Sequence, residues 1–144
     1  MRVLYTVFLA IFLCVTAFAA ESIGSIKKVS GQVTVVRGSE TLTPEAGFRL
    51  FKGDIVRTSA SSSAGIIFKD STLFSLGQNS EVMMTEYVFE PKDEQYAFSL
   101  NMKKGSAVYE SGRLGKLAPE AVKVHTPKAT IGIRGTRFLV QVDE

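Results

Sequence analysis

The sequence contains one cysteine, Cys14, one histidine, His125, and no tryptophan. Because Cys14 lies inside an N-terminal apolar segment, the rest of the chain has no thiol to form a disulfide, ligate a metal or act as a nucleophile. One histidine cannot build a His-based metal cluster within one chain, and any Ser-His-Asp triad would have to use it. His125 precedes Thr126-Pro127 at the end of a strand-like segment, which favours a hydrogen-bonding role. We therefore expect no metal site, no cofactor and no catalytic residue.

The surplus of positive charge is small. The chain has 17 Lys and Arg against 14 Asp and Glu, a formal net charge of +3, and the two signs alternate along it. The only adjacent cations are Lys27-Lys28 and Lys103-Lys104. This mixture is typical of a solvated protein surface and lacks the basic stripe that nucleic-acid binding requires. We expect no nucleic-acid partner.

The N-terminus has the composition of a secretory signal peptide. Arg2 supplies a positive charge, and residues 3–20 form an apolar run that ends before Glu21. Within this run, Ala17-Phe18-Ala19 has the small-x-small pattern that signal peptidase cleaves. The sequence therefore predicts a signal peptide over residues 1–19, a domain over residues 20–144, and export out of the cytoplasm.

Two alternatives for the N-terminal segment stay open. The apolar run is close to the roughly 20 residues that a membrane-spanning helix needs, so it could remain uncut as an anchor. The domain would contact a membrane only in that case. The second alternative is a lipoprotein acylated on Cys14, although Leu13 stands where such a motif requires a small residue.

The remainder of the chain predicts an all-β fold of short, mostly antiparallel strands, arranged as a rolled, solenoid-like or sandwich sheet. Short alternations of apolar and polar residues are interrupted by Gly, Asp-Ser, Asn or Pro every eight to twelve residues or so, which is the spacing of sandwiches and barrels. A short helical turn is expected around Pro44–Gly47, and irregular chain over Gly112–Glu120. The predicted strands are Ile26–Val36, Glu40–Thr43, Asp54–Thr58, Ala64–Phe68, Thr72–Leu76, Val82–Glu90, Gln95–Met102, Ser106–Glu110, Val122–Thr126, Ala129–Ile133 and Thr136–Val142.

The alternation also predicts which side chains point inward. Each buried aliphatic or phenyl group contributes roughly 1.5–3 kcal/mol, so this set is large enough to stabilise one domain. The predicted inward positions are Val33, Val35, Ile55, Ile67, Phe74, Leu76, Phe98, Leu100, Val108, Val124, Ile131, Ile133, Phe138 and Val140.

Two places are candidates for binding. Arg134 stands between Gly132 and Gly135, where a strand reverses. Our interpretation is that its guanidinium locks this corner by bonding buried acceptors; the alternative is a contact with an anion or a protein partner. Phe48 and Phe51 lie in a less regular stretch, and they either cap an open end of the sheet or form an exposed docking patch.

The segment around Arg134 resembles the FecR domain family, which typically ends in T-P-x-A-x-x-x-x-R-G-T-x-F. Here this string spans residues 126–138, from Thr126-Pro127-Lys128-Ala129 to Arg134-Gly135-Thr136-Arg137-Phe138. Earlier family motifs are similar and occur in order. They are Gly31-Gln32-Val33, Gly53-Asp54-Ile55-Val56-Arg57-Thr58, Ala64-Gly65-Ile66-Ile67-Phe68-Lys69-Asp70-Ser71 and Gly105-Ser106-Ala107, with Ser71-Thr72 where the family has Gly-Ser.

The resemblance implies a periplasmic, all-β module. Its best-known members are transmembrane regulators that relay a signal from an outer-membrane iron transporter to a sigma factor, through a cytoplasmic segment ahead of the membrane helix. Only Met1-Arg2 precede the apolar run here, so the anti-sigma role is not carried over. The expectation is a signal-sensing or protein-binding module of the cell envelope whose partner is another envelope protein. The alternative is a module that binds a cell-wall glycan or a small solute. The family motif defines no binding residues.

Overall fold

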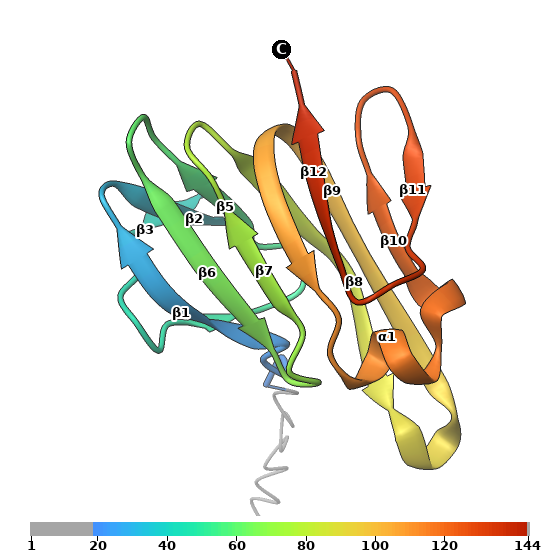
Figure 1. Ribbon diagram of the computed structural model, residues 1–144. Coiled ribbons are helices and arrows are strands. Elements are labelled where there is room, and N and C mark those ends of the chain that lie inside the picture. The colour runs from blue at the N-terminus through green and yellow to red at the C-terminus, as the bar shows by residue number, and fades with distance from the viewer. Residues whose placement is uncertain (1–18, 144) are drawn as a thin grey trace, which may run out of the picture.

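The computed structural model describes residues 19–143, so the predicted signal peptide and Cys14 lie outside the described residues except for Ala19. No helix between residues 19 and 143 has the length and apolar character to cross a membrane. The chain folds into strands with one short α-helix and two 3-10 turns (Figure 1). The strands are β1 Gly24–Ser30, β2 Val33–Arg37, β3 Glu40–Leu42, β4 Arg49–Leu50, β5 Ile55–Thr58, β6 Ser63–Phe68, β7 Leu73–Leu76, β8 Glu81–Glu90, β9 Gln95–Glu110, β10 Val122–His125, β11 Thr130–Gly132 and β12 Arg137–Val142. The helical segments are η1 Pro91–Asp93, α1 Arg113–Leu117 and η2 Pro119–Ala121.

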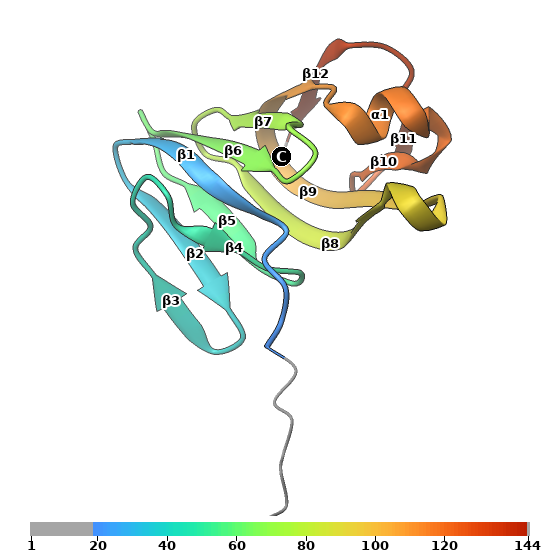
Figure 2. The same ribbon diagram turned by 90° about the horizontal axis from the view of Figure 1, so that it is seen from below.

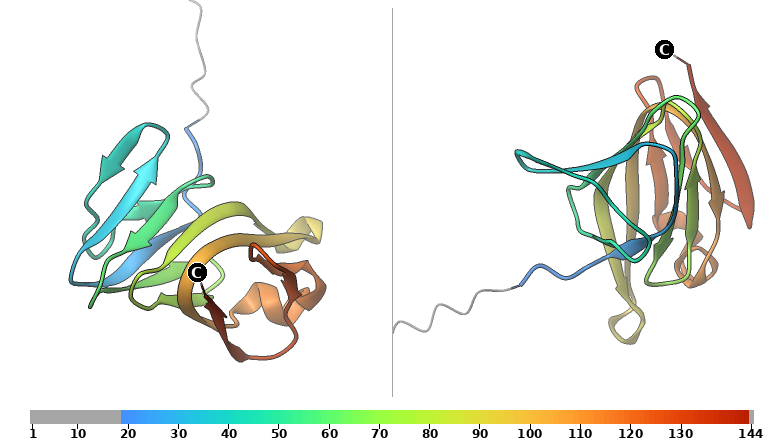
Figure 3. Two further views of the ribbon diagram at one scale, coloured as in Figure 1. Left: turned by 90° about the horizontal axis from the view of Figure 1, so that it is seen from above. Right: turned by 90° about the vertical axis from the view of Figure 1, so that its left-hand side faces the viewer.

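All strands belong to one sheet that curls into a half-barrel, which confirms the all-β, mainly antiparallel prediction (Figure 2). The order along its main path is β3-β2-β5-β8-β9-β7-β6-β1-β4. From β9 the sheet also extends to β12 and to the pair β10 and β11. Only the pairing of β9 with β10 is parallel among these strands. The sheet has two arms that meet at β9: one contains β8, β5, β2 and β3, and the other contains β7, β6, β1 and β4. Figure 3 shows these two arms facing each other, and the core lies between them.

The long strand β9 holds the two arms together. One of its edges pairs with β8 and then with β7, and its other edge pairs with β10 and then with β12. The sequence predicted a break inside this strand, but the strand is continuous. Gly105 lies where the neighbours change, and its φ of 92° is a conformation that favours glycine. The glycine therefore bends the strand without ending it.

A different glycine divides what was expected to be a single strand. Residues 26–36 form β1 and β2, with Gly31 between them at a φ of 73°. Pro44–Gly47 forms a turn without helix, because Gly47 N–H bonds to the carbonyl of Ile26 at 2.7 Å. The helical turn predicted there is wrong. Within residues 19–143, the one α-helix spans Arg113–Leu117, in the stretch that was expected to be irregular.

The core lies inside the half-barrel and is rich in aromatic rings. Phe98 makes an edge-to-face contact with Phe68 at 4.9 Å between centroids and another with Tyr109 at 5.8 Å. Tyr87 stacks on Phe68, and Phe138 packs against Tyr109. Aromatic pairs of this kind contribute about 0.5–1.5 kcal/mol beyond the area they bury. These rings come from β6, β8, β9 and β12, so they join both arms of the sheet.

Most of the predicted inward positions are buried, and three are displaced by one residue. Those three are Ile55, Ile67 and Val108, which are half-buried while their neighbours occupy the core. A strand has a period of two, so an error of one residue exchanges its faces. Ile131 and Phe138 are also half-buried, and both pack against the core from its border. Val56 is buried in place of Ile55, and Ile66 in place of Ile67. Ala107 and Tyr109, on either side of Val108, are buried in its place.

The turn between β6 and β7 contains an unfavourable residue. Ser71 has a φ of 70°, and its N–H bonds to the carbonyl of Phe68 at 3.0 Å. A left-handed conformation costs a non-glycine residue roughly 1–2 kcal/mol. Glycine avoids this cost but loses more conformational entropy on folding than serine does, so a substitution to glycine gains only part of it. We expect Ser71→Gly to raise the free energy of unfolding by about 0.5–1 kcal/mol. Denaturant titration measures this change, and Ser75→Gly, at an exposed position on β7, should instead destabilise. A lower stability of Ser71→Gly would contradict the expectation.

Candidate functional site

Arg134 lies in the corner between β11 and β12 and is exposed to solvent. It makes no hydrogen bond or ion pair with any residue between 19 and 143, so the interpretation that it bonds buried acceptors is wrong. The corner is held in another way. Ile133 is buried and its N–H reaches the carbonyl of Val122 at 3.4 Å, while Gly135 turns the chain at a φ of 135°. Because the neighbouring residues carry out the structural task, the guanidinium is free to meet a partner.

A shallow hollow of about 380 Å³ lies beside Arg134. Its walls come from η2, β10 and the end of β11, which lie near α1 and away from the C-terminus (Figure 1). Val122 and Ile133 are buried beneath it, and Glu120, Lys123 and Arg134 stand at its rim. Its complete lining is Pro119, Glu120, Val122, Lys123, Gly132, Ile133 and Arg134.

The surroundings of this hollow are strongly cationic. Residues 111–137 contain six Lys and Arg and one acidic residue, Glu120, and all six cations are exposed. Arg137 pairs with Glu110 at 3.4 Å, and Arg113 lies over the ring of Phe89. The other four cations have no ion pair or hydrogen bond within the described chain. Of these four, Lys123 and Arg134 line the hollow, and we name these two residues, together with the hollow, the basic corner. Lys116 lies on α1, and Lys128 lies at the other end of the β10–β11 hairpin, beside Gln141 and Asp143.

The basic corner also has an apolar element. Leu117, at the end of α1, is 54% exposed and is one of two large hydrophobic side chains that the described part of the chain presents to solvent. It is only two residues ahead of Pro119, which lines the hollow. An exposed leucine beside unpaired cations suits an acidic protein segment that also carries an apolar side chain.

Phe48 and Phe51 lie elsewhere, around the guanidinium of Arg37. That guanidinium stands 5.4 Å from the Phe48 ring centre and 4.6 Å from that of Phe51. It also binds both carboxylate oxygens of Asp54, at 2.9 and 2.8 Å. Both rings are half-buried, and Phe48 packs against the core. This is the arrangement that the cap interpretation describes.

The pair of Arg37 and Asp54 fixes this end of the sheet. Asp54 is 1% exposed and also accepts the Phe51 N–H at 2.9 Å. The hydrogen bonds that Arg37 donates to Asp54 raise the pKa of Arg37 above its usual value. Arg37 donates further to the carbonyl of Arg49 at 3.0 Å. The sequence pattern placed Asp54 only at the start of a predicted strand and did not reveal this bridge between β2 and the β4–β5 connection.

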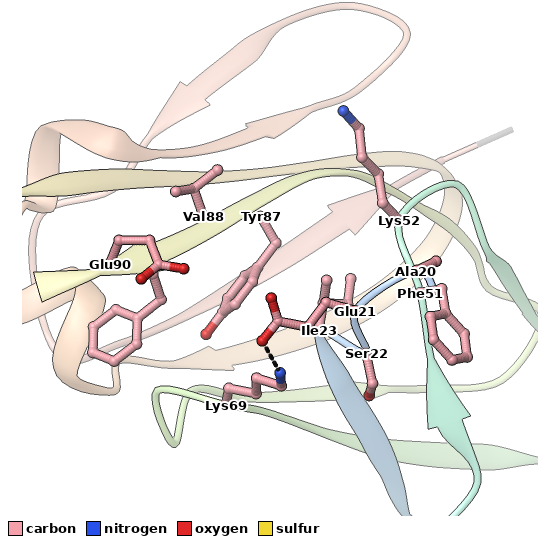
Figure 4. Close-up of a pocket in the computed structure, with 11 residues that line it drawn as sticks. Ala20, Glu21, Ser22, Ile23, Phe51, Lys52, Lys69, Tyr87, Val88 and Glu90 are labelled. Carbon is pink, nitrogen blue, oxygen red and sulfur yellow. Dashed lines mark hydrogen bonds and ion pairs between the residues drawn. The ribbon is translucent and has the colours of Figure 1, made fainter. Parts of the chain in front are cut away.

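A second hollow of about 400 Å³ lies where the N-terminal segment meets β8 (Figure 4). The ion pair of Glu21 and Lys69, 2.7 Å between Oε1 and Nζ, lies at this hollow, and its hydrogen bond lowers the pKa of Glu21. The Tyr87 hydroxyl donates a hydrogen bond to Asp70, so Tyr87 contributes mainly ring carbon atoms to its wall of the hollow. The hollow is lined by Ala20, Glu21, Ser22, Ile23, Phe51, Lys52, Lys69, Tyr87, Val88, Phe89 and Glu90.

His125 has no acid or metal-ligating neighbour among the described residues. Its Nδ1 lies 2.9 Å from Thr130 Oγ1, which links β10 to β11. Within residues 19–143, no group of three or more His, Cys, Asp or Glu side chains is placed to hold a metal ion.

A family model described as FecR protein matches residues 54–144, well over half of the chain. The chain belongs to the FecR family. No curated protein and no solved structure matches it.

The FecR motifs now have positions in the fold. The R-G-T triplet is the exposed corner after β11, so its arginine is available while its glycine takes the positive φ. The aspartate of the G-D step, Asp54, and that of the β6–β7 hairpin, Asp70, are both buried and multiply bonded. Ser71, which replaces the hairpin glycine of the FecR pattern, keeps the left-handed conformation. The match begins at Asp54, so Gly31-Gln32-Val33 lies outside it.

Proposed function

We propose that this FecR protein is an exported module of the periplasm that binds another envelope protein through its basic corner. The observation that carries the proposal is the state of Arg134, an exposed arginine of the family motif with no partner in the described fold. Lys123, a second unpaired cation, lines the same hollow, and the exposed Leu117 lies two residues before Pro119 of its wall. The charged N-terminus, apolar run and small-residue site support export. The partner is expected to present a carboxylate-rich surface segment.

Charge reversal at the corner tests this proposal. We expect Arg134→Glu to reduce the amount of envelope protein that the tagged full chain retains by about tenfold or more, because the corner would repel an acidic segment. The tagged protein is recovered from the periplasmic fraction and its captured proteins are identified by mass spectrometry. The melting temperature should remain near that of the parent, since exposed substitutions usually change stability by less than about 0.5 kcal/mol.

Lys92→Glu is the matched control. Lys92 is an exposed cation on η1, outside the basic corner. This variant should retain the same protein as the parent. Equal retention by Arg134→Glu and the parent would refute the proposal, and so would a large fall in the melting temperature of Arg134→Glu. Recovery of the protein from the cytoplasm alone would refute the exported location.

The hollow at the N-terminal segment supports a second candidate function, the binding of a small solute. Tyr87, Val88 and Phe89 give it an aromatic and aliphatic wall, and Glu21 and Lys69 place charge beside it. This lining suits an apolar molecule with a polar end better than a glycan, which requires more hydrogen-bonding groups. Arg134→Glu should leave such binding unchanged, which distinguishes the two functions.

A further inference from the structure

The strand β12 is a free edge of the sheet. All six of its residues pair with β9, without a shift of register, and with no other strand of the described chain. The other three strands that end the sheet are much shorter: β3 has three residues, β4 has two and β11 has three. Short edges protect a sheet from pairing with other chains. This protection is missing at β12.

The residues of β12 lack most of the other common devices against edge pairing, since the only charged side chain in the strand is that of its first residue, Arg137. The strand contains no lysine and no proline, and its unbroken register leaves no bulge. Its exposed face instead presents Leu139, which is 65% exposed and is the more exposed of the two large apolar side chains at the described surface. A long, flat edge with an apolar outer face is suited to adding a further strand.

The side chains along this edge separate cleanly by face. Val140 is buried, and Phe138 and Val142 are half-buried against the core. The outer face continues from Arg137 at one end, through Leu139 and Gln141, to Asp143 just after the strand. The cation and the anion therefore lie at opposite ends of one face.

This arrangement is complementary to itself. In an antiparallel pair, residues directly opposite each other share a face. If Val140 lies opposite Val140 of a second copy, Arg137 meets Asp143 of that copy, and Asp143 meets its Arg137. Leu139 then meets Gln141 on the same face. Centring the pair on Leu139 would set Asp143 against Gly135 and would lose both charge pairs.

We propose that a second copy of this chain pairs antiparallel with β12, centred on Val140, to give a two-fold symmetric dimer with one continuous sheet. Such an interface uses the same patch twice, which is the usual form of a homodimer contact. It satisfies the outward backbone groups of β12 and covers Leu139 on both copies. The proposal does not depend on the basic corner, because it uses a different strand and different residues.

A pair of charge variants tests the dimer. In Arg137→Glu, the new carboxylate would face Asp143 of the other copy, and in Asp143→Lys, the new ammonium group would face Arg137 of the other copy. Each variant alone should therefore weaken dimerisation by about tenfold or more, because two like-charged pairs replace two opposite ones. An equimolar mixture of the two variants restores both opposite pairs and should regain the dimer. Sedimentation velocity of the full chain, in the form the host exports, measures this.

Several results decide the question. Lys92→Glu, with the same change of charge as Arg137→Glu but on η1, should dimerise like the parent. The proposal is overturned if the parent sediments as a monomer at all concentrations, or if either single variant remains as dimeric as the parent. It is also overturned if the mixture stays monomeric while both variants keep the melting temperature of the parent. A monomeric parent that captures a different protein at β12, lost in Leu139→Lys, would also overturn it. Arg134→Glu should leave the dimer intact even if it abolishes capture at the basic corner.

Discussion

Asp70→Ala should lower the free energy of unfolding by about 3 kcal/mol or more, which is a large part of the stability of a domain of this size. Asp70 is fully buried and accepts hydrogen bonds from the Tyr87 hydroxyl at 2.9 Å and from the Leu114 N–H at 3.0 Å. It also accepts the Thr72 hydroxyl. Removal of the carboxylate leaves these buried donors without an acceptor, at a cost of roughly 1–3 kcal/mol for each.

The position of Asp70 makes this loss global. Thr72 lies in the same turn as Asp70, whereas Tyr87 belongs to β8 and Leu114 to α1, so one carboxylate links its own hairpin to two distant segments. Burial, together with the charge of Asp70, raises the pKa of Tyr87 far above its usual value, which favours the protonated phenol that donates to Asp70. Denaturant titration measures the effect. Asp93→Ala, at an exposed aspartate on η1, is the control and should change stability by less than about 0.5 kcal/mol. Equal stability of both variants would contradict this account.

Gly105→Ala should also destabilise the fold by about 3 kcal/mol or more, because strain and overlap add together. The residue has a φ of 92°, and an added Cβ would overlap the Cα and the hydroxyl of Ser80. Ser80 cannot withdraw easily, since its hydroxyl accepts the Ser106 N–H at 3.0 Å and its own N–H binds Thr58 Oγ1 at 3.0 Å. The substitution is therefore expected to disrupt the bend that Gly105 introduces into β9.

Two other glycines separate strain from overlap. Gly38 has a φ of 61° with open space around its added Cβ, so Gly38→Ala should cost only the strain of roughly 1–2 kcal/mol. Gly132 lacks both the positive φ and any near neighbour, so Gly132→Ala should be nearly neutral. Thermal and denaturant unfolding of the three variants should rank Gly105→Ala as the least stable. A Gly105→Ala variant no less stable than Gly38→Ala would show that β9 does not need its bend.

The sequence predicted the strands well because local signals specify them. Alternation marked β6 and β7, and turn residues marked most of their ends. It could not choose the buried face where both faces are apolar. Ile66 and Ile67 follow each other directly, and only pairing with β1 and β7 shows that Ile66 points inward. The same limit applies to Ile55 and Val56.

The sequence could not predict the site in the same detail because its contacts are distant along the chain. Asp70 resembled an ordinary turn residue, and its bond to Leu114 joins segments that no local pattern connects. For Arg134, the expected structural role was wrong. Ile133 and Gly135 already hold the corner, which only the burial of one and the backbone angle of the other reveal.

The shared strand β9 also constrains the order in which the chain can fold. Two of its partners, β7 and β8, precede it, and the other two, β10 and β12, follow it. Until β9 arrives, β7 and β8 each present an unpaired edge, and pairings between distant segments of this kind form slowly. All four pairings must then agree on one register of β9, so they should form together. The interval before β9 docks is therefore the stage at which a newly made chain most needs shielding from other unfolded chains.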